Sequence, residues 1–192
     1  MSTRRRLPAA ERRTLILAAA QEVFAQRGYH GSSLDDIAKA SGTSKALIYE
    51  HFDSKRTLHD ALLREHAAEL GRRFAANAAS GAVGEERLRA GIDVFFEWVG
   101  ERHDAWRALF RDAADPELRP LIDRLQSQAT QAIVPLVPPG GSDQDVEMYA
   151  SLISGACQAL ANWWGDHPDV PRAELTARVM DVVWTGMSGL EG

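Results

Sequence analysis

The stretch SGTSKALIYEHFDSK, residues 41–55, gathers hydroxyl, cationic and aromatic side chains on one short predicted helix. Lys45 and Tyr49 are four residues apart, so their side chains share one face of that helix. Ile48 and Phe52 are also four apart, and this apolar pair occupies a different face. Packing against a core requires only the second pair. The first pair therefore indicates a helix that presents a cation and a phenol hydroxyl to something outside the protein.

The N-terminal end of this predicted helix favours an anion. Thr43 and Ser44 lie there, where unpaired backbone N–H groups and the helix dipole attract phosphate. Lys45 adds a positive charge. Ala46 is small enough to allow close approach to the floor of a groove, and Leu47 can touch a thymine methyl group. Together these residues predict a helix that enters the major groove of duplex DNA.

The charge of the chain is divided unevenly. Residues 1–60 hold 10 Lys and Arg against 7 Asp and Glu, whereas the rest holds 12 against 20, and the net charge is −5. A basic first third on an acidic remainder is consistent with an N-terminal part that meets a polyanion. Arg4, Arg5 and Arg6 belong to a predicted basic arm over residues 1–9, which either enters the minor groove or stays solvated.

Composition indicates an ordinary globular protein, with 45% hydrophobic and 26% charged residues. Cys157 is the only cysteine, so no internal disulfide can form, which suits a reducing compartment. No apolar run approaches the roughly 20 residues of a membrane span, and the basic first residues lead into no signal-peptide core. We therefore expect a cytoplasmic protein.

Nearly every segment has the periodicity of an amphipathic helix, and alternating runs typical of strands are absent from the sequence. We therefore predict an all-α protein. Ser33 and Asp36 have the spacing of a capping box, and Gly42 can end the helix that follows in a turn with positive φ. The change from basic to acidic composition predicts an N-terminal domain over 1–55 and a C-terminal domain over 56–192. The predicted helices cover about residues 14–28, 33–42, 43–52, 53–77, 85–102, 104–113, 116–135, 144–164 and 172–189.

Three short helices with a tight turn between the second and third form a helix-turn-helix unit. From about Ile16 to Leu58 the chain resembles the DNA-binding domain of the TetR/AcrR family of transcriptional regulators. The segments that match, in the family's order and spacing, are ILAAAQEVFAQRGY, SSLDDIAKASG, TSKALIYEHF and DSK. The resemblance implies an Ω-shaped, all-helical homodimer whose N-terminal domains bind DNA and whose C-terminal domains dimerise and hold an inducer.

The resemblance also implies roles for single residues. It places Ser33 and the start of its helix at backbone phosphates, and Lys55 at a phosphate beside the fourth helix. Tyr49 and His51 fall at positions that contact the DNA backbone. The positions that face the groove are Ser44, Lys45 and Ala46.

The chain departs from the family's pattern at three positions of the helix predicted over 43–52. The family often has glycine in place of Ala46, a small hydroxyl residue in place of Leu47, and valine in place of Thr43. With Ala46 and Leu47 in place of these residues, fewer hydrogen-bonding groups are available to read bases, so the operator sequence is harder to predict. Thr43 in place of valine costs little packing.

Each proposed DNA contact has a plainer interpretation. Lys45 and Lys55 can be solvated surface lysines. Tyr49 can pack against the first helix, and His51 can cap a helix or pack. Ser33 can serve only as a cap.

Large aromatic side chains gather in the C-terminal part, where all five tryptophans lie past residue 90. Most aromatic residues at helical spacing belong to a core, but this set exceeds what a compact bundle needs. We therefore predict an apolar pocket between helices for a small hydrophobic or aromatic molecule. The candidate lining residues are Phe95, Trp98, Trp106, Phe110, Met148, Leu152 and Trp163.

The predicted helices near 144–164 and 172–189 mix small residues with bulky apolar ones. Small residues let helices approach closely, so these two helices are the predicted four-helix dimer interface. The resemblance implies the same placement. The small residues on the first of them are Ser154, Gly155, Ala156 and Ala159.

An enzyme is the main alternative class. His59 and His66 have no third ligand at metal spacing, and Asp93 and Glu97 have the spacing of a solvated pair on one helix. The sequence has neither a phosphate loop nor a nucleophile elbow, so we expect no catalysis, metal or cofactor. We expect a repressor that binds a palindromic operator as a dimer and is released by a small hydrophobic or aromatic inducer. The alternatives are an activator and a DNA-binding regulator without a small-molecule ligand.

Overall fold

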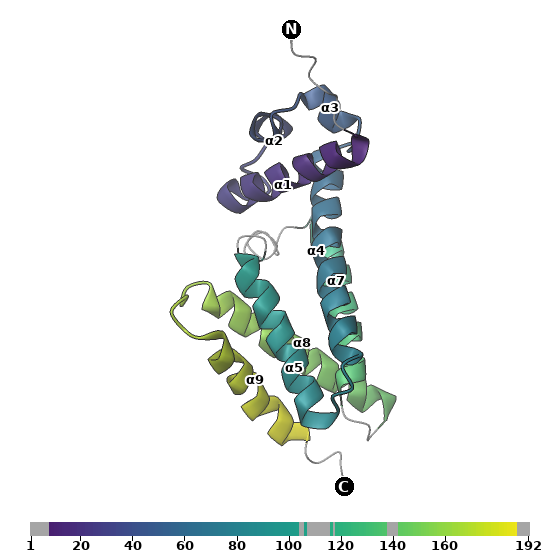
Figure 1. Ribbon diagram of the computed structural model, residues 1–192, viewed down its shortest axis with the longest axis vertical. Coiled ribbons are helices and arrows are strands. Elements are labelled where there is room, and N and C mark those ends of the chain that lie inside the picture. Colours follow the sequence, from purple (N-terminus) through teal and green to yellow (C-terminus); the bar gives the residue numbers. More distant parts are fainter. Residues whose placement is uncertain (1–7, 104–105, 107–115, 117, 138–141, 188–192) are drawn as a thin grey trace. The chain divides into compact units, whose positions relative to one another are not determined.

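The computed structural model describes residues 8–103, 106, 116, 118–137 and 142–187. Within these residues all regular structure is helical, which confirms the all-α prediction (Figure 1). None of the described helices is both long and apolar enough to cross a membrane. The elements are α1 (Ala9–Arg27), α2 (Leu34–Ser41), α3 (Lys45–Tyr49), α4 (Lys55–Ala78), α5 (Gly84–Glu101), α7 (Arg119–Ile133), the 3-10 helix η1 (Val134–Leu136), α8 (Asp143–Trp164) and α9 (Arg172–Met187).

Two helices begin elsewhere than the sequence predicts. α1 begins at Ala9, directly after Pro8, although the apolar stripe that marks it in the sequence starts only at Ile16. α7 begins at Arg119 rather than near residue 116, and it has a proline in its first turn. The N–H groups of a first turn have no acceptor within the helix, so proline costs no hydrogen bond there. The helix predicted over 104–113 lies outside the described residues except at Trp106.

The chain divides into two compact units, which we call the head (Met1–Glu65) and the body (His66–Gly192). α4 contributes residues to both, because the division falls inside it, after Glu65. The sequence places the boundary earlier, after residue 55. The first turns of α4 belong to the head because His59 lies against the rings of Phe24 and Tyr29, with centroids 4.9 and 5.1 Å away. An ion pair of 2.5 Å between Arg13 and Glu65 fastens the same stretch to α1.

The core of the head is built from α1, the short helices α2 and α3, and the start of α4. The side chains of Ile16, Phe24, Ile37, Ile48 and Leu58 are almost entirely removed from solvent. Burial of each such side chain contributes about 1.5–3 kcal/mol to folding, and this offsets the weak intrinsic stability of short helices.

Two glycines shape the connections between the head's helices. Gly42 ends α2 with φ of 64°, a left-handed conformation that glycine adopts without steric cost. At Gly31 a Cβ atom would lie 2.3 Å from the carbonyl oxygen of Arg27. The end of α1 and the loop that follows it therefore approach each other more closely than any larger residue permits.

The core of the body lies between α5, α8, α9 and η1. α5, α8 and α9 lie side by side (Figure 1). α5 supplies several fully buried side chains of this cluster, including Leu88, Phe96 and Val99. α8 faces it with Ile153 and Cys157. Burial raises the pKa of the Cys157 thiol to about 12, so this side chain is a neutral packing group.

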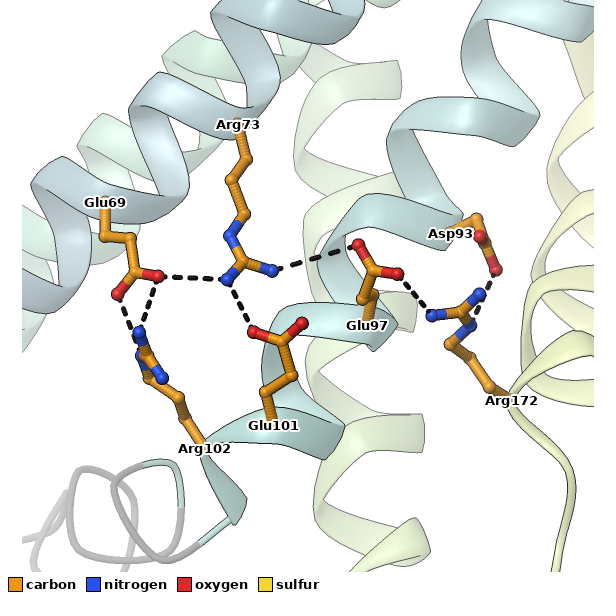
Figure 2. A network of polar contacts seen from close by, with 7 residues as sticks. All are labelled: Glu69, Arg73, Asp93, Glu97, Glu101, Arg102 and Arg172. Carbon is orange, nitrogen blue, oxygen red and sulfur yellow. Dashed lines mark hydrogen bonds and ion pairs between the residues drawn. The ribbon is translucent and has the colours of Figure 1, made fainter.

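A chain of ion pairs fastens the second half of α4 to α5 within the body (Figure 2). The Arg73 guanidinium contacts Glu69 on its own helix at 3.0 Å and Glu97 and Glu101 on α5. Arg102, at the end of α5, donates to both oxygens of Glu69 at 2.6 and 2.8 Å. Glu69 therefore lies between two guanidinium groups from different helices.

The same chain of ion pairs continues to the start of α9 (Figure 2). One oxygen of Glu97 lies 3.8 Å from Arg73 and the other accepts from Arg172 at 2.8 Å. Arg172 also lies 3.2 Å from Asp93. Two consecutive helices, α4 and α5, and the distant helix α9 are thus joined by charged groups that share partners. Shared partners favour such a network over isolated ion pairs, because fewer side chains must be ordered for each contact.

The charged network predicts a specific acid sensitivity of the body. Burial opposes ionisation of Glu69, but hydrogen bonds and charge attraction from Arg102 and Arg73 outweigh it and lower its pKa below 4.5. A lowered folded-state pKa stabilises the fold above pH 4.5, and this contribution disappears as pH falls through the folded-state value. Glu69→Gln should therefore lower the free energy of unfolding by about 1 kcal/mol at pH 7, and the difference from wild type should shrink below pH 4.5.

Urea unfolding followed by tryptophan fluorescence measures this, because all five tryptophans lie past residue 90 and report on the body. Glu85→Gln is the matched control, since it removes an exposed pair with Arg89 within α5 and should have a smaller effect. A deficit in Glu69→Gln that stays constant from pH 7 to pH 3 would contradict the assignment.

Candidate nucleic-acid interface

α3 is a helix of five residues whose two sides have different environments. Ile48 is fully buried and Phe52 nearly so, which confirms that this pair packs into the head's core. Lys45 and Ala46 are exposed, and Tyr49 keeps 50% of its surface in solvent. The α3 surface that the sequence assigns to DNA is therefore open to solvent in this chain, whereas contact with DNA itself remains a prediction.

Hydroxyl groups at the start of α3 already make hydrogen bonds within the head. The Ser44 hydroxyl accepts from the N–H of Leu47 at 3.2 Å and so caps α3. The Thr43 and Ser41 hydroxyls lie 2.8 Å apart, and the Thr43 N–H donates to the carbonyl of Ala38 at 3.0 Å. These contacts fix the turn between α2 and α3. Leu47 is half-buried beside them.

The start of α2 is held by a reciprocal cap. The Ser33 hydroxyl accepts from the Asp36 N–H at 3.1 Å, while the Ser33 N–H donates to the Asp36 carboxylate at 3.0 Å. The same hydroxyl donates to that carboxylate at 2.6 Å, and Arg27 contacts it at 2.6 Å. Hydrogen bonds from Ser33 lower the pKa of Asp36. Since the Ser33 hydroxyl is engaged in this cap, a phosphate at this point would meet the backbone N–H groups of the first turn.

Lys55 points back into the head. Its ammonium donates to the carbonyls of Tyr29 at 2.7 Å and Ser32 at 3.0 Å, and it lies 4.3 Å from the centre of the Tyr29 ring. Two of its three N–H donors therefore hold the loop between α1 and α2, which leaves one donor for a phosphate.

His51 is half-buried, and its ring centroid lies 6.4 Å from that of Phe52. Its Nε2 atom is buried and has no hydrogen-bond partner among the described residues. The position of the His51 side chain is typical of a packing residue rather than of a side chain that is presented to solvent for contact with DNA. The basic arm over residues 1–9, apart from Pro8 and Ala9, lies outside the described residues.

Lys45 makes a contact that the sequence analysis missed. Its ammonium lies 2.7 Å from the carboxylate of Asp35 in the first turn of α2. The hydrogen bond and charge of Asp35 raise the pKa of Lys45. Helical spacing cannot reveal a contact between residues ten apart on two different helices, and only the geometry of the turn between them does so.

In the body, three of the predicted pocket residues lie together. Phe95 and Trp106 meet edge to face at 5.4 Å, and Trp98 lies 6.3 Å from Trp106. The Trp106 indole donates to the Asn162 side chain at 2.9 Å. Trp98 and Trp106 belong to the buried core. Phe110 lies outside the described residues.

The remaining pocket candidates are not part of this aromatic group. Met148, Leu152 and Trp163 lie on the solvent-exposed side of α8, with 51%, 64% and 43% of their surfaces exposed. Trp163 stacks on His167 with ring centroids 3.9 Å apart. Helical periodicity places these three residues on α8 but does not tell which side of α8 meets the core. Among the described residues, no three His, Cys, Asp or Glu side chains are grouped so that they could hold a metal ion.

Comparison with known proteins shows which family has this arrangement. Residues 16–62 match the model of bacterial regulatory proteins of the tetR family, and residues 85–186 match that of the tetracyclin repressor-like C-terminal domain. The transcriptional repressor KstR2 of Mycobacterium tuberculosis is 32% identical over 92% of this chain and 93% of its own length. The transcriptional activator FasR of Mycolicibacterium smegmatis is 27% identical over 95% of this chain and 86% of its own length.

A solved structure of FadR from Bacillus subtilis in complex with stearoyl-CoA has the same fold, with a TM-score of 0.79 and 22% identity over 92% of this chain and 98% of that one. The two family models thus match most of the N-terminal helix-turn-helix domain and most of the C-terminal helical domain. Together they identify the protein family. The chain belongs to the TetR family of transcriptional regulators, which are DNA-binding proteins and not enzymes.

Proposed function

We propose that this regulator binds a palindromic operator through α3 and the start of α2, and that a small apolar ligand in the body changes its affinity for that operator. The observation that carries the DNA-binding part is the two-sided environment of α3. Ile48 anchors the helix in the core, while Lys45 and Tyr49 remain in solvent. A helix held in this way can enter the major groove without rearrangement of the head. Such a protein acts at the nucleoid, in the cytoplasm.

A palindromic operator requires two copies of the chain. Two α3 helices must lie about 34 Å apart to enter successive major grooves on one side of a duplex. α8 and α9 are the proposed dimer helices, because they leave the apolar side chains of Met148, Leu152 and Val182 exposed in the single chain. Apolar residues exposed together commonly mark a protein interface.

The ligand proposal is supported by the aromatic composition of the body. The group formed by Phe95, Trp98 and Trp106 supplies large apolar surfaces, which suit a hydrophobic or aromatic molecule. The structure of FadR with stearoyl-CoA makes a long-chain acyl-CoA the first compound to test. Because α4 belongs to both head and body, a ligand that binds one arrangement of α4 better than another changes operator affinity by that difference.

Repression relieved by ligand is the proposed mode of action, since operator occupancy alone is enough to block transcription. Activation is the second candidate, because FasR is named an activator whereas KstR2 is named a repressor. Reporter expression from the regulated promoter, with and without the gene for this chain, distinguishes the two directions.

Retardation of DNA from the upstream region of its own gene tests the DNA-binding proposal. Replacing Lys45 and Tyr49 together by alanine should weaken retardation at least tenfold, since one charge contact and one hydroxyl contact are lost. Arg89→Ala removes an exposed cation from the body and is the control. Equal retardation by wild type and the double variant would refute the proposed interface.

Addition of stearoyl-CoA to the retarded complex tests the ligand proposal, with free CoA as the control. Release by the acyl compound alone supports an apolar inducer. If neither this compound nor a panel of aromatic acids changes retardation or tryptophan fluorescence, the regulator without a small-molecule ligand is the better description.

Lys55 provides a separate prediction about phosphate contact. Lys55→Met keeps the alkyl stem but removes all three N–H donors, so binding to DNA at 50 mM salt should weaken about tenfold and the slope of log K against log salt should become shallower by about 0.9. Arg64→Met, an exposed change on the same helix, is the control. Weaker binding with an unchanged slope would mean that Lys55 acts only by holding the carbonyls of Tyr29 and Ser32.

A further inference from the structure

Asp35 places an anion on the surface that α3 presents to solvent. Its carboxylate lies 2.7 Å from the ammonium of Lys45, and 68% of the Asp35 side chain and 46% of the Lys45 side chain are exposed. The pair therefore contributes little to the stability of the head, because water and salt screen exposed charges.

The cap of α2 does not account for Asp35. The capping box uses the carboxylate of its neighbour Asp36, which meets both the hydroxyl and the N–H of Ser33. Asp36 also receives the contact from Arg27. A second carboxylate in the first turn interacts favourably with the helix dipole, but any exposed acid there would do the same. What distinguishes Asp35 is its direct contact with the cation at the start of α3.

That contact occupies Lys45 with an oxygen anion of the protein itself. A phosphate oxygen of DNA, or the O6 and N7 atoms of guanine, would need the same ammonium. To contact them, Lys45 must release the carboxylate or share its donors with it. While the pair persists, Lys45 adds almost no net charge to the surface that attracts a polyanion.

We infer that Asp35 is an affinity- and specificity-determining residue, which weakens binding to duplex DNA of any sequence by holding Lys45 in an ion pair. This inference rests on the proposed DNA-binding role of α3. On a non-specific duplex, a phosphate oxygen only takes the place of the Asp35 carboxylate as the partner of Lys45. Lys45 therefore adds little to the free energy of non-specific binding. At an operator, close approach of α3 to base edges supplies further contacts that compensate for release of Asp35. The pair thus lowers non-specific binding more than operator binding, which raises discrimination.

Binding to a 30-base-pair duplex of random sequence tests the inference without knowledge of the operator. Asp35→Asn keeps the size of the side chain but removes its charge, so Lys45 becomes free to contact a phosphate. Affinity should rise about tenfold at 50 mM salt and about threefold at 200 mM, and the slope of log K against log salt should steepen by about 0.9. A change in head stability alone would not alter this slope. Asp35→Ser serves as a second variant, and circular dichroism confirms folding of each.

A double-mutant cycle shows whether Asp35 acts through Lys45. In the Lys45→Met background, Asp35→Asn should leave affinity unchanged within twofold. Glu50→Gln is the matched control, because it removes one exposed negative charge next to α3 from a residue that has no ion pair among the described residues. Its effect should be smaller than that of Asp35→Asn.

Three results would overturn the inference. Asp35→Asn could strengthen binding equally with and without Lys45, which would show general repulsion of DNA. It could weaken binding, which would show that Asp35 itself contacts the duplex. It could leave affinity and slope unchanged while Lys45→Met weakens binding, which would leave the proposed function intact and remove only the role of Asp35. If no variant retards the random duplex at 50 mM salt, the inference fails, whereas the proposed function fails only if DNA from the upstream region is not retarded either.

Discussion

Burial of Ile48 is the constraint on which the account of the head depends. α3 has only five residues, far fewer than a helix needs to be stable alone in water. It exists because Ile48 and Phe52 insert into a core shared with α1, α2 and the start of α4. The position of these two side chains fixes the rotation of α3 about its axis. That rotation alone determines that Lys45, Ala46 and Tyr49 remain on the solvent side.

Several polar groups of the proposed interface have partners within the head. Ser33 and Ser44 cap helices, Lys55 holds two carbonyls, and Lys45 is paired with Asp35. Such contacts limit the conformational entropy that these side chains lose when DNA binds. They also mean that a hydroxyl or cation at a DNA-facing position of the sequence is not necessarily free to contact DNA. In the body, the network around Arg73 performs a different task, because it joins α4, α5 and α9 by charges that share partners.

Local rules predicted much of the head. Ser33 and Asp36 have the spacing of a capping box, Gly42 suits a left-handed turn, and the four-residue spacing of Ile48 and Phe52 marks a buried face. The structure has each of these features. All depend on contacts within a few residues, so composition and spacing are sufficient to find them.

Features that depend on distant contacts were not accessible in this way. The inward hydrogen bonds of Lys55 and the pair between Asp35 and Lys45 join different helices, and no periodicity reports on them. The same holds for the extent of the head along α4, which follows from packing of His59 on Phe24 and Tyr29. On α8, an apolar stripe identified the helix, but Met148 and Leu152 lie on its exposed side, because apolar residues occur on more than one face of this helix and spacing alone does not tell which face meets the core.

The most direct test of the central claim is a map of backbone amide shifts by nuclear magnetic resonance, recorded as the intact protein is titrated with duplex DNA from its upstream region. The account predicts that the largest changes occur in residues 33–36 and 43–51, while the amides of the body's core change little. Changes concentrated in the body, with α3 unaffected, would contradict it.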